Sequence, residues 1–136
     1  MLILTETDVR SLLTLADAVP AIRHAVAEEA RGRVLNPHRT VIEYPAAEAA
    51  ALHMPSAMPA IGQSAVKVVT IFPHNPERGL RTTQGVILLS SSEDGRHLAC
   101  MDASYLTRLR TGAIAAVASD FLARTDARVV AVTGCG

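Results

Sequence analysis

The chain has 136 residues, of which 49% are hydrophobic, and this fits one folded domain rather than a disordered chain. Its 13 basic residues balance its 13 acidic residues, so it has no excess positive charge for nucleic acid or an anionic membrane. With no tryptophan, two tyrosines and two phenylalanines, it also has few rings on which bases could stack.

The sequence favours a cytoplasmic protein. Its N-terminus has no basic segment followed by a long apolar run, so we expect no signal peptide. No apolar run approaches the roughly 20 residues needed to cross a bilayer, so we expect no membrane partner. The two cysteines, Cys100 and Cys135, are too few for a secreted disulfide scaffold, and no histidine or cysteine pair has zinc-like spacing. We therefore expect no bound metal.

The first third of the chain predicts helices. After a brief strand at 2–4 and a short helix capped by Thr5, a second helix is expected from about Asp17 to Arg31. Asp17 is its expected N-cap, because Pro20 then falls in the first turn, where no backbone N–H is needed. Glu28 is expected to face solvent.

The middle of the chain predicts a meander of about five strands. The expected strands are 40–44, 51–54 closed by Pro55, 65–72, 82–90 and 97–101. A helix capped by Asp102 or Ser104 follows them. Together these elements predict an α+β domain, in which a helix pair and a mostly antiparallel sheet pack with the helices on one face.

Residues 128–133 predict one further strand, of the parallel type, and Gly134 and Gly136 follow it. A strand leading directly into Gly-x-Gly is how a dinucleotide-binding Rossmann domain begins. The third glycine, the helix and the acidic residue of that fingerprint would lie past residue 136. The unpaired edge of such a strand predicts poor solubility or an oligomer.

Three cations stand out as candidate ligands for a small anion. Lys67 lies inside a buried-type strand, where a lysine must reach solvent, pair with an anion or lose its charge. An equally weighted alternative is an edge-strand lysine that blocks aggregation. Arg39 precedes another strand, and Arg110 lies on a helix. Arginine is the natural bidentate partner of a carboxylate, and lysine supplies a point charge beside it, but spacing alone does not bring the three together.

Several segments match, in order, the motifs of one enzyme family. They are Pro37-His38-Arg39-Thr40, His53-Met54-Pro55, residues 66–73, Thr82-Thr83-Gln84-Gly85, residues 98–102, residues 106–113 and residues 121–124. In this arrangement they resemble the ornithine cyclodeaminase/mu-crystallin family over nearly the whole chain from Leu4 onward. The segment Leu-Thr-x-x-Arg-Thr, combined with the strand around Lys67, is the most specific part of the resemblance.

The resemblance implies a two-domain NAD(P)-dependent enzyme, a homodimer that acts on amino acids or cyclic imino acids. Residues 1–111 would be the substrate-binding and dimerisation domain. Residues 112–136 would be the linking helix and first strand of a truncated Rossmann domain. Carried over by position, the substrate carboxylate would be held by Arg39, Lys67 and Arg110. The residues against NAD or NADP would be Thr82, Arg110, Thr111, Gly134 and Gly136.

The resemblance also implies the reaction, which is conversion of ornithine to proline plus ammonia, reduction of a ketimine such as pyrroline-2-carboxylate, or interconversion of an amino acid and its oxo acid. Ornithine-cyclising members have a glutamate two residues before the Met-Pro pair, where this chain has Leu52. That difference favours an imino-acid reductase or amino-acid dehydrogenase. The family's acid/base aspartate is expected beyond residue 136, so this chain alone is expected to be inactive. The alternative is a non-catalytic fragment that only dimerises or binds a small carboxylate.

Overall fold

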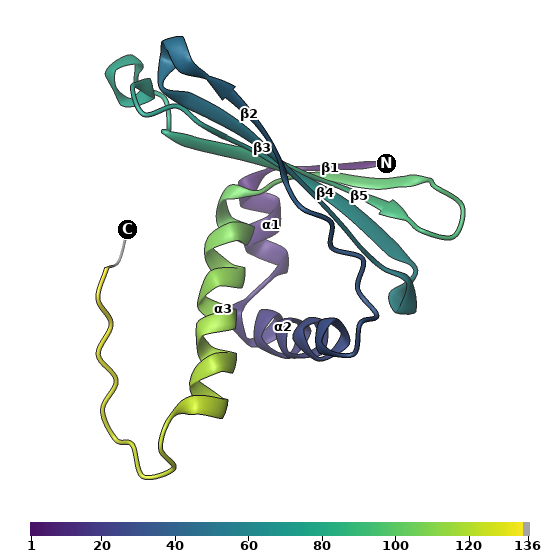
Figure 1. Cartoon of the computed structure of the whole chain (residues 1–136), viewed down its shortest axis with the longest axis vertical. Helices are drawn as coiled ribbons and strands as arrows, with labels where there is room; N and C mark the ends of the chain where they lie inside the picture. The colour runs from purple at the N-terminus through teal and green to yellow at the C-terminus, as the bar shows by residue number, and fades with distance from the viewer. Residues whose placement is uncertain (135–136) are drawn as a thin grey trace.

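The computed structural model describes residues 1–134 as a layer of strands and a layer of helices (Figure 1). In chain order the elements are β1 (Leu2–Leu4), α1 (Glu6–Leu12), α2 (Leu15–Ala30), β2 (Thr40–Tyr44), β3 (Ala49–Met58), β4 (Gln63–Ile71), β5 (Thr83–Ser91), β6 (His97–Asp102) and α3 (Ser104–Leu122). Each connection between consecutive strands from β2 to β5 contains a short 3-10 turn, and these turns are Pro45–Ala47, Pro59–Ile61 and Asn75–Arg78.

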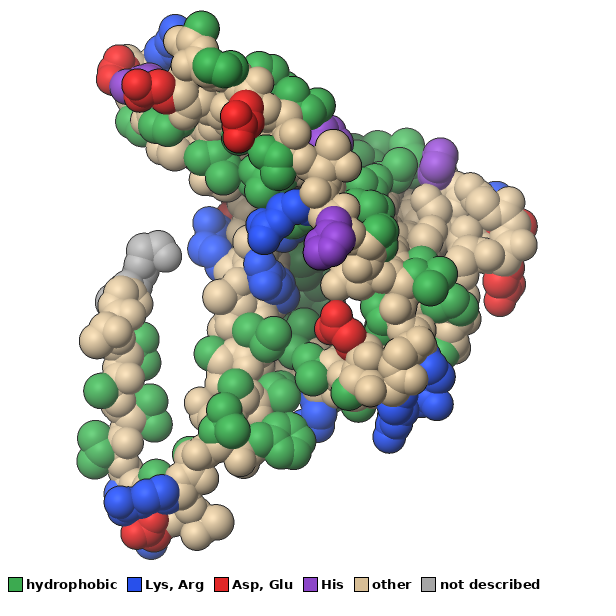
Figure 2. All heavy atoms as spheres, viewed as in Figure 1, with side chains coloured by type: hydrophobic (Ala, Val, Ile, Leu, Met, Phe, Trp, Pro, Cys, Tyr) green, Lys and Arg blue, Asp and Glu red, His purple; other side chains and the backbone are tan. Residues whose placement is uncertain are grey.

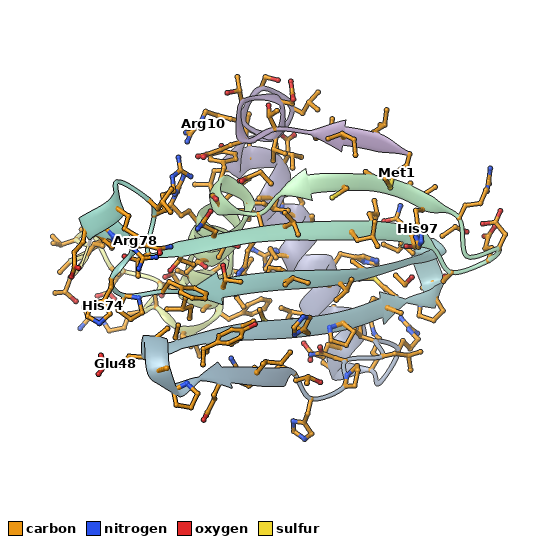
Figure 3. The ribbon with its side chains drawn as sticks, turned by 90° about the horizontal axis from the view of Figure 1, so that it is seen from above. Met1, Arg10, Glu48, His74, Arg78 and His97 are labelled. Carbon is orange, nitrogen blue, oxygen red and sulfur yellow. The ribbon has the colours of Figure 1, made fainter. Side chains whose placement is uncertain are left out.

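Within residues 1–134 the strands form one six-stranded sheet in the order β1-β6-β5-β4-β3-β2. β2 to β6 pair antiparallel with their neighbours, while β1 pairs parallel with β6. Figure 3 looks down on this sheet, with the helices behind it. The predicted α+β class with a mostly antiparallel sheet is confirmed.

The helices α1, α2 and α3 lie on one side of the sheet, and the other face carries no helix among the described residues (Figure 1). α3 buries Leu109, Ala113 and Val117, whose spacing of four residues places them on one side of the helix, and α2 packs against α3. No described helix is long and apolar enough to cross a membrane.

Gly85 sets how closely α3 approaches the sheet. The Ala103 N–H, at the start of α3, donates to the Gly85 carbonyl at 2.9 Å. A Cβ at Gly85 would lie 3.1 Å from the Val68 carbonyl oxygen and 3.3 Å from the Ala103 Cβ. The missing side chain therefore lets the N-terminus of α3 rest directly on β4 and β5.

The start of α2 differs from the prediction. Thr14, rather than Asp17, is the N-cap, because the Thr14 hydroxyl accepts from the Asp17 N–H and the Asp17 carboxylate accepts from the Thr14 N–H. Pro20 consequently lies inside the helix, where it cannot donate a backbone hydrogen bond to the preceding turn.

Glu28 was expected to face solvent, but it is buried at 3% exposure. Its carboxylate accepts hydrogen bonds from Arg31 at 3.0 Å and from Arg33 at 2.7 Å. The Arg33 hydrogen bond is the main reason that the pKa of Glu28 falls to about 2. The acid thus ties the end of α2 to the segment that leads into β2.

β3 was expected to end at Pro55, but it continues to Met58. Ala57 and Leu35 exchange backbone hydrogen bonds of 2.8 and 2.9 Å on the side of β3 that faces β2. Because backbone groups alternate along a strand, the nitrogen of Pro55 points to that same side. The regular pairing with β2 extends only to His53, so the missing N–H of Pro55 removes no bond from it.

Residues 128–133 were expected to form a strand, and they do not. No described strand runs beside them to pair with their backbone groups, and a strand requires such a partner. The predicted domain boundary between residues 111 and 112 falls within α3, which runs unbroken through it. That division into domains stays a prediction.

Candidate functional site

Lys67 lies in the centre of the sheet, on the face that the helices cover. It pairs with Met54 on β3 and with Ile87 on β5, and such paired residues share a face. Two residues along, Val69 pairs with Leu52 and Gly85 on the same face. Because Gly85 contacts Ala103 at the start of α3, this face is the one toward the helices. Lys67 is therefore not on an edge strand, and the aggregation-blocking alternative is wrong.

The structure brings Lys67 and Arg110 close to each other. Burial first, and then the positive charge of Arg110, lower the pKa of Lys67 below its ordinary value. Lys67 is also the single lysine of the sequence. Within residues 1–134 neither side chain forms an ion pair with a carboxylate. Two neighbouring cations without a counter-ion favour binding of an anion.

Arg39 is exposed and lies directly before β2. Thr40, the next residue, pairs with His53, so continuing the register would place Arg39 opposite Met54 and on the Lys67 face. It makes no ion pair with the described residues. Extending the register of β2 by one residue thus puts Arg39 in the row of Lys67, outside the strand itself.

A recess lies next to Lys67, between the first two turns of α3 and strands β4 and β5. We call it the α3 recess; its volume is about 320 Å³, and it is lined by Val69, Arg81, Thr83, Gln84, Gly85, Ala103, Ser104, Thr107 and Arg108. Figure 2 shows basic side chains gathered where the sheet meets the upper part of α3. The lining thus combines the basic side chains of Arg81 and Arg108 with a largely apolar surface that includes Val69 and Ala103.

The remaining predicted site residues lie around this region but are not all part of it. Thr111 follows Arg110 on the exposed side of α3, and its hydroxyl donates to the Thr107 carbonyl at 2.7 Å. Thr82 is not in the α3 recess, although Thr83 is; its carbonyl accepts from the Phe72 N–H at 2.8 Å. Gly134 has φ = +84°, the left-handed conformation that suits a glycine turn. Gly136 lies outside the described residues.

The sequence did not single out Glu6, which organises one wall of the α3 recess. Its carboxylate accepts from Arg10 at 3.1 Å and from Arg81 and Arg108 at 2.7 Å each. These hydrogen bonds, with that of Arg81 the strongest, lower the pKa of Glu6 to about 2. No local pattern predicts a cluster whose members lie 75 and 102 residues from Glu6.

A family model and individual relatives both match this chain. The model of the ornithine cyclodeaminase/mu-crystallin family matches residues 1–136. The alanine dehydrogenase of Archaeoglobus fulgidus is 37% identical over 135 residues, which are 99% of this chain and 41% of that protein.

Two solved structures share the fold. The first is an archaeal alanine dehydrogenase dimer with bound NAD; it is 36% identical with a TM-score of 0.87, covering 93% of this chain and 38% of that one. The second is the Thermococcus litoralis Δ1-pyrroline-2-carboxylate reductase in complex with NADH and L-proline. It is 35% identical with a TM-score of 0.87, covering 93% of this chain and 39% of that one. This chain spans about two fifths of the length of these relatives, and it belongs to the ornithine cyclodeaminase/mu-crystallin family.

Proposed function

We propose that this chain forms the substrate-binding part of an NAD(P)-dependent enzyme that reduces an imino acid or interconverts an amino acid and its oxo acid. One observation carries the proposal. Lys67 is partly buried beside Arg110, its pKa is lowered, and no described carboxylate pairs with either cation. A partly buried cation with a second cation beside it is stabilised when a carboxylate binds between the two.

The cations would act together on the substrate carboxylate. The planar guanidinium of Arg110 offers paired N–H donors that match the two carboxylate oxygens, and the Lys67 ammonium adds a point charge. Arg39 directly precedes β2 and falls in the same row across the sheet, so it would contact the carboxylate from the β2 side of the site. Their shared role is to hold the substrate so that its α-carbon has one fixed orientation.

A nicotinamide cofactor, when bound, would supply or accept the hydride. Arg110 and Thr111 are exposed together on α3, so this side of the helix is open to a cofactor next to the carboxylate site. Thr82, at the entrance to β5, and the glycine turn at Gly134 are the other candidate contacts. Solved relatives with bound NAD or NADH support the use of a nicotinamide cofactor.

Leu52 supports a reductase or dehydrogenase over an ornithine cyclodeaminase. It pairs with Val69 on the Lys67 face, so its side chain lies on the substrate side of the sheet. An apolar side chain there offers no counter-charge to the δ-ammonium of ornithine. A substrate with an uncharged or acidic side chain is therefore the better match.

We also propose a homodimer that forms through the sheet face opposite the helices. Ile42, Tyr44 and Val86 alternate with the Lys67-face residues and are exposed on that side. An uncovered apolar sheet face favours association. The dimeric archaeal alanine dehydrogenase supports this assembly.

Calorimetric titration of the protein with L-proline, pyrroline-2-carboxylate and L-ornithine tests the carboxylate site. Lys67→Met and Arg110→Met should each weaken binding about tenfold to a hundredfold, the cost of losing one charged hydrogen bond. Arg96→Met is the matched control, since Arg96 pairs with Asp94 in the β5–β6 turn. Failure of the wild-type protein to bind any of these carboxylates would contradict the proposal. Carboxylate binding without any NAD(P) binding would favour the non-catalytic alternative.

A further inference from the structure

We propose that the α3 recess is a subsite for a second anionic group of the substrate, so that the favoured substrates are dicarboxylic amino or imino acids. This inference rests on the proposed function, because it takes Lys67 and Arg110 as the site of the first carboxylate. The structure supports it through the charge around the recess, its distance from Lys67 and the free donors of its two arginines.

The charge around the recess is positive, although two acids lie beside the arginines that line it. Glu6 is shared by three guanidiniums, those of Arg10, Arg81 and Arg108. Asp102 is engaged at the start of α3, where it accepts from the Ser104 N–H at 2.7 Å and from the Ser104 hydroxyl at 3.3 Å. Three arginines against two carboxylates leave one positive charge.

Unused donors remain in the recess. A guanidinium has five N–H donors, and Arg81 and Arg108 each donate one recorded hydrogen bond to Glu6. Both side chains line the recess and are more than half exposed, at 61% and 57%. An incoming carboxylate can therefore bind to them without displacing Glu6.

The recess lies at the right distance for a short dicarboxylic acid. Val69 on its floor is two residues from Lys67 along β4, which is about 7 Å on the same face of the strand. Three or four carbon–carbon bonds of ~1.5 Å separate the carboxylates of a four- or five-carbon dicarboxylic acid by about 4 to 5 Å. The flexible lysine and arginine side chains can span the remaining gap.

The other lining groups also suit an anion. Thr83 and Thr107 bring hydroxyl donors to the recess. The N-terminus of α3 also lies at the recess; its N-cap residue, Ala103, has no capping side chain, and the Asp102 carboxylate accepts from the Ser104 N–H there. The positive end of a 19-residue helix adds to the attraction for negative charge.

The test compares succinate with butyrate, which have the same number of carbons but differ in one carboxylate. The protein should bind succinate at least about tenfold more tightly than butyrate, the gain of one charged hydrogen bond. Arg108→Met should reduce succinate affinity to the level of butyrate and leave butyrate binding unchanged. Lys67→Met should weaken both ligands, and Arg96→Met neither. Arg81→Met serves as a second probe of the recess if Arg108→Met does not fold.

Glu6→Gln separates a binding role of the arginines from a purely structural one. Removing the internal carboxylate frees donors of Arg81 and Arg108, so succinate should bind several-fold more tightly while butyrate does not change. Equal affinity of the wild-type protein for the two ligands, or an equal loss of both in Arg108→Met, would overturn this inference alone. If neither ligand binds to the wild-type protein, the carboxylate site proposed above fails as well.

Discussion

Two effects act against the positive charge of Lys67. Burial and the nearby Arg110 both disfavour the ammonium form, and they lower its pKa from the ordinary value of 10.5. A group whose pKa is lowered by folding binds protons less readily in the folded state. For a lysine, this means that the charge costs stability below the folded pKa, and that the cost disappears as the pH rises through that pKa toward 10.5. A bound carboxylate would offset this cost.

We predict that the pKa of Lys67 rises in Arg110→Met but stays below 10.5, because burial, the larger cause, remains. Since Lys67 is the single lysine, reductive ¹³C-methylation adds one side-chain signal besides that of the N-terminus, and its NMR titration gives the pKa. Arg96→Met should leave the value unchanged. A carboxylate ligand should raise it, and carboxylate affinity should decline as the pH rises through the folded pKa. The same pKa in the wild-type protein and Arg110→Met would show that the two side chains do not interact.

At the scale of elements, α3 connects the site to the sheet. Its N-terminus rests on Gly85, its second turn carries Arg108 and Arg110, and its buried side packs against α2. Two glycines in this region have opposite roles. Gly85 permits a close approach of backbone, whereas Gly112 lies within the helix, and a Cβ there would meet only the Leu15 Cδ1 at 3.8 Å.

We predict that Gly85→Ala and Gly112→Ala shift stability in opposite directions. Gly85→Ala should destabilise the protein by about 1 to 3 kcal/mol, because the new Cβ is too close to backbone atoms of β4. Gly112→Ala should stabilise it by about 0.5 to 1 kcal/mol, since alanine restricts the unfolded chain and favours the helix. Urea unfolding followed by circular dichroism measures both. Stabilisation by Gly85→Ala would mean that α3 does not press on the sheet as described.

At the scale of the molecule, residues 1–134 form a sheet with one face covered by helices and one face without them (Figures 1 and 3). The covered face carries Lys67 and the α3 recess, so any association through the other face leaves the site open. Val86 lies on the face without helices and is 47% exposed at the centre of the sheet.

We predict that the protein is a dimer in sedimentation experiments and that Val86→Glu makes it a monomer. A glutamate there would be buried without a partner in the dimer, at a cost of several kcal/mol. Ile114→Glu is the control, because Ile114 is exposed to a similar extent, 42%, but lies on α3. Circular dichroism checks that both variants stay folded. A wild-type monomer would contradict the prediction.

Local signals such as capping residues and prolines predict most helices and strands, and the wrong element ends occur where two such signals compete. The Thr-x-x-Asp capping pattern correctly predicts the helix start at Thr5, but at Thr14 the same pattern competes with Pro20, which indicates a later start for α2 than the structure has. Pro55 falsely indicates the end of β3, because the sequence does not show on which side of a strand the proline nitrogen lies. Residues 128–133 have the composition of a strand but no partner in the described chain.

The sequence by itself determined the α+β class and the antiparallel meander, because these depend on periodicity and turn residues, and it predicted Lys67 and Arg110 as carboxylate ligands from the few residue types that bind carboxylates. Only the tertiary structure decided that Lys67 faces the helices, that Arg110 is its neighbour and that Thr83 rather than Thr82 lines the α3 recess. It alone brought Glu6 to Arg81 and Arg108, across 75 and 102 residues of sequence. Charges so far apart along the chain meet only after the sheet and α3 have packed, and no local pattern encodes that approach.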